Sequence, residues 1–284
     1  MKPKQALMAL FLLVCTGLLH AAPRAGFYAD YQKVTDPDFK EWNTAFRKER
    51  ALEGIAEELN SMVRIPSPIA LSLEECGEAN AFYDPEARRV SLCYEMASEL
   101  IDLFGEDRSE EEVDDLVSGT MMFFLGHEVG HALTDVLDLP ITGREEDAAD
   151  QLAVLMLSDG SEDSELALIA AAETFATWAE DAEADEDSFA DEHSLDEQRL
   201  YNILCWSYGR DPEAYEDFVT DGLLPEDRAD GCAEEFERLE RSWNRLLEEH
   251  LITDSPMRRR NAESDDQEEA EEEEDLETVG YKRR

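Results

Sequence analysis

The stretch that decides the fold is residues 121–131, which read MMFFLGHEVGH. Its first five residues would make a helix apolar on every side, and such a helix is expected to be buried at the centre of the molecule. We predict this helix over 111–137, with Pro140 as the break that follows it. His127 and His131 are four residues apart, so both project from the same face of the predicted helix.

Two imidazoles on one helix face can bind the same metal ion. Glu128 directly follows His127 and projects about 100° away around the helix, toward the open side of such a site. The segment HEVGH therefore has the form HExxH, which is typical of zinc hydrolases. We predict a zinc site with His127 and His131 as ligands and Glu128 as general base. The alternative is two core histidines with ordinary partners.

A third ligand is expected on a second helix, predicted over 143–158 with Thr142 and Glu145 as its capping box. If the two helices form an antiparallel hairpin, His131 lies about 9 Å before the end of the first and Glu146 about 6 Å into the second. Glu146 can then face His131. Asp150, one turn further on, could accept the free N–H of a ligand imidazole. Either carboxylate could instead belong to a solvated helix face.

The remaining pattern predicts a mostly helical α+β fold with a small sheet next to the HExxH helix. Strands are expected at 27–34 and 69–73. Residues 79–83 and 89–94 flank a turn signal and predict a β-hairpin. Helical periodicity extends over 38–62, 95–104, 164–182, 194–208 and 227–252. Ser194 and Glu197 have the spacing of a second capping box, and 183–192 is an acidic loop.

The chain is strongly acidic. Its 284 residues hold 71 Asp and Glu against 25 Lys and Arg, a formal net charge of −46. Such a charge repels phosphate backbones, so nucleic acid is excluded as a partner. Adaptation to high external salt and simple solubility both fit this charge. We expect a folded metallopeptidase-like domain over 23–253 and a disordered acidic tail over 254–284.

Residues 1–22 have the layout of a secretory signal peptide. Two lysines precede an apolar run over 6–19, and cleavage is expected near Ala22. The run is too short to span a membrane comfortably, and no later segment reaches the necessary length. We therefore expect an exported protein, periplasmic or secreted, without a membrane span after signal cleavage. A lipoprotein attached through Cys15 is the weaker alternative.

Four cysteines remain after signal cleavage, and an even number in an exported protein suggests disulfides. Chain order favours Cys76 with Cys93 and Cys205 with Cys232, one of three possible connectivities. The spacings contain no CxxC, which disfavours a zinc–thiolate site.

HEVGH followed by EDAAD resembles the gluzincin pattern, HExxH followed by ExxxD. On that resemblance Glu146 is the third zinc ligand and Asp150 the supporting acid. The chain is also similar to a family of exported bacterial metallopeptidases known mainly as sequences. This similarity implies a zincin-like zinc peptidase and no particular substrate. The matching stretches are Glu75–Gly77, Asn80–Tyr83, Cys93–Glu95, Gly126–His131, Gly143–Asp150 and Asp191–Gln198.

His193 precedes the predicted helix over 194–208, whose N-terminus would lower the pKa of the imidazole. A histidine near the zinc could stabilise the oxyanion, as a downstream histidine does in thermolysin-like enzymes. A purely structural loop histidine is the alternative. The expected substrate is a peptide or protein, which the hairpin edge could bind as an added strand. The competing functions are a zinc-binding module without proteolysis and an acidic partner-binding protein with a vestigial site.

Overall fold

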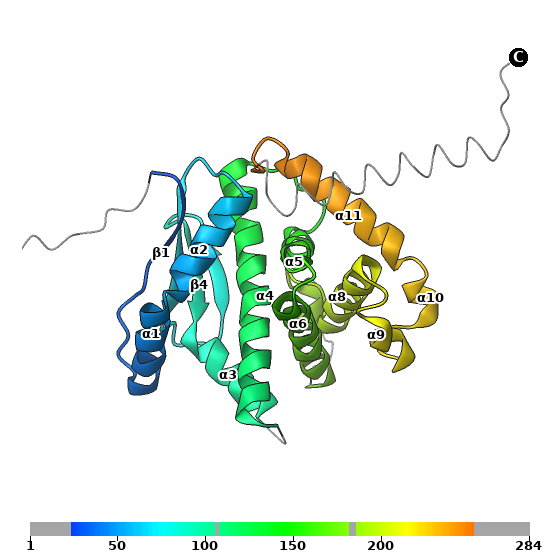
Figure 1. The fold of residues 1–284 in the computed structure, drawn as a ribbon, viewed down its shortest axis with the longest axis horizontal. Coiled ribbons are helices and arrows are strands. Elements are labelled where there is room, and N and C mark those ends of the chain that lie inside the picture. Colours follow the sequence, from blue (N-terminus) through cyan, green and yellow to red (C-terminus); the bar gives the residue numbers. More distant parts are fainter. Residues whose placement is uncertain (1–23, 106–107, 182–185, 253–284) are drawn as a thin grey trace, which may run out of the picture.

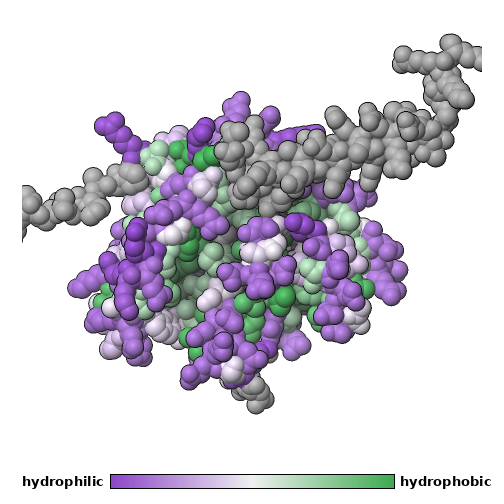
Figure 2. All heavy atoms as spheres, viewed as in Figure 1, coloured by the Kyte–Doolittle hydropathy of each residue, from purple (hydrophilic) through white to green (hydrophobic). Residues whose placement is uncertain are grey.

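The computed structural model describes residues 24–105, 108–181 and 186–252. The predicted signal peptide over 1–22 and the predicted acidic tail over 254–284 lie outside these residues. The expected α+β fold, mostly helical with a small sheet, is confirmed (Figure 1). Among the described residues no helix is both long and apolar enough to cross a membrane. The face seen in Figure 2 is covered mainly by hydrophilic residues, with hydrophobic patches between them.

The sheet has four strands in the order β1-β2-β4-β3. β1 (Gly26–Ala29), β2 (Pro68–Glu74) and β4 (Arg89–Cys93) are parallel to one another. β3 (Ala81–Asp84) is antiparallel to β4 and forms one edge, so the predicted hairpin is present. β1 is shorter than the strand expected over 27–34.

The expectation of one helix over 38–62 is wrong. α1 (Pro37–Glu49) and α2 (Ala51–Met62) are separate helices. Arg50 between them has a left-handed backbone, with φ 58°, which ends a right-handed helix. The apolar periodicity continues across this residue, so periodicity alone did not reveal the break. α3 (Tyr94–Phe104) follows β4 directly, close to the predicted range.

The central helix is α4 (Glu110–Leu137), which agrees with the prediction of 111–137. Ser109 caps its N-terminus in a capping box with Glu112. The sheet lies on one side of α4, and α5 (Glu145–Met156) and α6 (Glu162–Asp181) lie on the other (Figure 1). The apolar residues 121–125 of α4 are therefore enclosed between the sheet and the two helices.

α4 and α5 pack so closely that only small residues fit between them. A Cβ on Gly130 would lie 2.9 Å from the Cα of Ala149, and one on Gly126 would lie 3.1 Å from the Cα of Ala153. The two contacts run in opposite directions along the two helices, so α4 and α5 are antiparallel. Gly130 therefore has a packing role that compensates for its poor helix propensity. This close approach places the first two turns of α5 against the histidines of α4.

The C-terminal half of the described chain is helical. It comprises α7 (Glu186–Ala190), α8 (Asp196–Arg210), α9 (Glu216–Thr220), α10 (Glu226–Ala229) and α11 (Cys232–Leu247). The acidic loop expected over 183–192 thus contains a short helix. The long helix expected over 227–252 is divided into α10 and α11.

Both capping boxes predicted for this region are wrong. The N-cap of α5 is Arg144, and no side chain caps it. The N-cap of α8 is Leu195, while the hydroxyl of Ser194 donates to Asp147 at 2.6 Å. For Ser194, a tertiary contact replaces the local cap.

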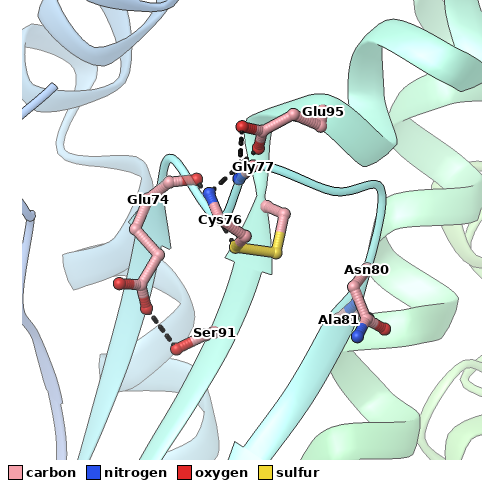
Figure 3. Close-up of a disulfide and its surroundings, with 8 residues drawn as sticks. Glu74, Cys76, Gly77, Asn80, Ala81, Ser91 and Glu95 are labelled. Atoms are coloured by element: carbon pink, nitrogen blue, oxygen red, sulfur yellow. Dashed lines mark hydrogen bonds between the residues drawn. A yellow bond between two sulfur atoms is a disulfide. The ribbon is translucent and has the colours of Figure 1, made fainter. Parts of the chain in front are cut away.

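Two disulfides join Cys76 to Cys93 and Cys205 to Cys232, the pairs expected from chain order. The first ties the loop after β2 to the end of β4 (Figure 3). In the same loop, the Glu95 carboxylate accepts hydrogen bonds from the backbone N–H groups of Cys76 and Gly77, at 3.1 and 2.8 Å. This loop leads into β3, so these bonds fix the start of the edge strand.

The contact between α4 and α5 predicts the effect of adding one methyl group. Gly130→Ala should lower the free energy of unfolding by about 1–3 kcal/mol, because the new Cβ overpacks against the backbone of α5. Gly54→Ala is the matched control, since nothing lies within 4 Å of a Cβ there. It should stabilise α2 by up to about 1 kcal/mol. Urea unfolding of both variants measures the difference, and equal effects would contradict the packing role.

Candidate metal centre

Three side chains from α4 and α5 converge at one point. The Nε2 atoms of His127 and His131 lie 3.2 Å apart. Each also lies close to Oε2 of Glu146, at 3.1 Å from His127 and 3.3 Å from His131. The structure therefore brings together the three residues that the sequence proposed as metal ligands.

The opposite nitrogen of each imidazole is held by a carboxylate. Nδ1 of His127 lies 2.7 Å from Oδ1 of Asp150, and Nδ1 of His131 lies 2.8 Å from Oε1 of Glu145. An N–H donated at Nδ1 leaves a lone pair at Nε2, directed toward the other ring and toward Glu146. In this tautomer three acceptor atoms face one another, an arrangement that a metal ion, or a proton on one Nε2 bonded to Glu146, would stabilise.

The spacing of these acceptors fits zinc. Ligand atoms about 2.0–2.1 Å from a tetrahedral zinc are about 3.3 Å from one another. The separations here are 3.1, 3.2 and 3.3 Å. Imidazole nitrogens with one carboxylate oxygen are also a donor set that zinc accepts in catalytic sites. The residues present therefore fit the ion that the sequence pattern predicts.

His193 reaches the same point from a distant part of the chain. Its Nε2 lies 3.0 Å from Oε2 of Glu146, and its Nδ1 lies 3.0 Å from Oδ1 of Asp191. One ligand atom each from His127, Glu146 and His193 lie within 4.8 Å of one another. The expectation that a helix N-terminus lowers the pKa of His193 is wrong. The hydrogen bond to Glu146 raises it, aided by Asp191.

The segment that carries His193 is tied to the beginning of α5. The Arg144 guanidinium donates to the backbone carbonyl of His193 at 2.9 Å. The Ser194 hydroxyl donates to Asp147, as described above. Because Glu146 lies between these two anchors on α5, they place the His193 ring beside its carboxylate.

Arg199, on α8, is a buried partner of the site that the sequence analysis missed. Its guanidinium donates two hydrogen bonds to Asp150, at 2.8 and 2.7 Å, and lies over the ring of Phe175. Both charged side chains are nearly inaccessible, with Asp150 3 % and Arg199 7 % exposed. One signal was present: Arg199 lies four residues before Ile203, on the apolar face of α8. A cation on such a face needs a buried anion.

This pairing keeps Asp150 ionised. Burial raises the pKa of its carboxyl, but the Arg199 charge and the hydrogen bond to His127 outweigh burial and hold that pKa below its ordinary value. For His131, burial lowers the pKa, whereas the carboxylates of Glu146 and Glu145 raise it to about 9. The site is thus a set of mutually compensating charges.

Glu128 is the exception, because it is buried without a partner. Its side chain lines the cleft and is only 6 % exposed. Within the described ranges no group donates a hydrogen bond to its carboxylate and no cation pairs with it. Burial raises its pKa, and the nearby imidazoles oppose this change. An unpaired buried carboxylate in a cleft is suited to exchange a proton with a bound molecule.

One wall of a cleft with a volume of about 630 Å³ is formed by the two histidines of α4, Glu128, the first glutamates of α5 and His193. The other wall is the edge strand β3 and the residues around it, from Asn80 to Pro85. Tyr83 projects from β3 onto α4, where its hydroxyl donates to Asp135 at 2.7 Å. This contact fixes the distance between the edge strand and the helix that carries the histidines.

The buried pair predicts a large effect at Arg199. Arg199→Met should lower the free energy of unfolding by about 3–5 kcal/mol, because Asp150 is left as an uncompensated buried charge. The double variant Arg199→Met/Asp150→Asn should recover part of this loss, since it removes both charges. Urea unfolding of the two variants measures the recovery. A double variant no more stable than the single one would contradict the pairing.

A family model described as "Putative metallopeptidase" matches residues 31–247. The match includes all the residues of the site described above and most of the chain. The comparison with curated proteins and the comparison with solved structures found no match. Since this match covers most of the chain, the chain belongs to this metallopeptidase family.

Proposed function

We propose that this protein is an exported zinc-dependent peptidase in which Glu128 acts as general base. The observation that carries the proposal is the convergence of His127, His131 and Glu146 beside the buried, unpartnered carboxylate of Glu128. His127, His131 and Glu146 would hold the ion. A bound zinc would supply Lewis acidity, which lowers the pKa of water and polarises a carbonyl group.

The residues of the chain supply the proton transfers. The Glu128 carboxylate takes a proton from the attacking water and later returns it to the leaving amine. Asp150 and Glu145 hold the Nδ1 atoms of the two ligand imidazoles, which keeps both rings oriented. We assign His193, at the side of the cleft, the role of donating a hydrogen bond to the oxygen on which negative charge develops, in exchange for its bond to Glu146.

The edge strand β3 offers a place for an extended substrate. The N–H of Cys93 donates to the carbonyl of Asn80, and hydrogen-bonded pairs alternate along an antiparallel ladder. The backbone groups of Ala81 and Tyr83 therefore point away from β4, toward the cleft. The Asn80 side chain accepts from the N–H of Ala81 at 2.9 Å, and a peptide carbonyl could take its place.

Export is part of the proposal. The layout of residues 1–22 predicts a signal peptide, and the two disulfides suit an oxidising compartment such as the periplasm or the extracellular space.

The general base predicts a separation of activity from metal binding. Glu128→Gln should retain its zinc but lose roughly 10²–10⁴-fold in kcat on a peptide substrate, because an amide cannot take the proton. Glu111→Gln, an exposed position on the same helix, is the control and should keep full activity. Unchanged turnover in Glu128→Gln would remove the assigned base. A wild-type protein that holds zinc but cleaves no peptide would favour the non-proteolytic binding module.

The ligand set predicts the metal content. Glu146→Ala should lose zinc on dialysis, because it removes the carboxylate on which the histidines converge. Glu111→Ala should keep the wild-type content. Elemental analysis of the purified mature proteins measures the zinc bound per chain. Full occupancy in Glu146→Ala would place the third ligand elsewhere.

A further inference from the structure

The cleft beside the candidate metal centre is lined by carboxylates. No lysine or arginine is among its described lining residues. Arg88, on the turn between β3 and β4, acts on the Tyr83 hydroxyl but does not line the cleft. The acidic lining residues are Glu128, Asp135, Asp138, Glu145, Glu146 and Glu192.

Three of these carboxylates, Asp135, Asp138 and Glu192, have no part in the metal centre, and the first two follow His131 in the chain. Asp135 follows His131 by four residues on the same face of α4, and Asp138 is the C-cap residue that comes directly after the helix, with a left-handed backbone. Asp138 lies about 10 Å beyond His131 along the helix axis. Both aspartates are exposed to solvent at the mouth of the cleft. The bond from the Tyr83 hydroxyl places Asp135 beside the edge strand.

The same end of the cleft also has apolar surface. Leu139 follows Asp138 at the end of α4, and Pro85 follows β3. A lysine or arginine side chain could bind here with its aliphatic stem against this apolar surface and its charged end near the aspartates. Glu128 gives an independent sign that the cleft receives a ligand, because its carboxylate is buried and no described residue pairs with it.

We propose that this end of the cleft is a subsite for a lysine or arginine side chain, so that the substrates are basic peptides. An extended peptide advances about 3.3 Å per residue. The 10 Å between His131 and Asp138 therefore places the basic residue two or three positions from the scissile bond. This inference rests on the proposed peptidase function and adds the class of substrate to it.

The net charge of −46 attracts any cationic peptide, so preference for a basic substrate does not alone test the subsite. Position does. The experiment uses zinc-loaded protein at fixed ionic strength and a set of neutral peptides with one cleavage point, in which a single arginine is moved along the chain. The measured quantity is kcat/KM for each peptide.

An arginine two or three positions from the cleaved bond should raise kcat/KM about two- to fivefold over other positions, the range for one exposed ion pair. Asp138→Asn should abolish this gain. Asp114→Asn is the matched control, since it removes one exposed carboxylate from the other end of α4 and should keep the gain. Equal gains at every position, or equal losses in the two variants, would overturn the subsite.

If the wild-type protein cleaves none of the peptides, the peptidase function fails, and the subsite is then decided by binding. Fluorescence anisotropy of a labelled arginine peptide with the zinc-loaded protein gives its Kd. Binding that weakens about two- to fivefold in Asp138→Asn but not in Asp114→Asn supports an acidic binding site without proteolysis. Equal Kd values in the two variants overturn it.

Discussion

The structure depends on the close contact between α4 and α5. Gly126 and Gly130 on one helix lie against Ala153 and Ala149 on the other, and a Cβ added at either glycine would lie only 3.1 or 2.9 Å from the facing backbone. Backbones at this distance place the carboxylates of α5 within hydrogen-bond reach of the imidazoles of α4. Larger residues at these positions would separate the helices, and the donor atoms would no longer converge. The small residues of the packing interface thus determine the geometry of the site.

The charges of the site are balanced by residues from three helices. His127 on α4 bonds to Asp150 on α5, which in turn pairs with Arg199 on α8. Each member is buried, so each depends on the next to offset the cost of leaving water. This chain of contacts orients one imidazole. The carboxylate of Glu128 stands outside this chain of contacts and has no partner among the described residues.

Much of the site could be predicted because its spacing is local. The histidines lie on one helix, and Glu146 and Asp150 lie in the first turns of the next. Helix geometry alone therefore predicted which of these residues face one another along the two helix axes. The helix break at Arg50 and the cap of α8 could not be predicted in this way. In the first, one backbone conformation interrupts a continuous apolar pattern. In the second, Ser194 bonds to Asp147 on another helix instead of capping its own.

The sequence by itself determined the central helix, the spacing of the two histidines and the glutamate between them, the acidic character and the order of the cysteines, because each is encoded in neighbouring residues or in composition. Only the tertiary structure decided that His193 meets Glu146, that Arg199 neutralises Asp150, and that the edge of β3 faces the histidines. These contacts join segments separated by tens of residues. These contacts form only when the helices and the sheet pack together, and the spacing of residues within one segment does not predict that packing.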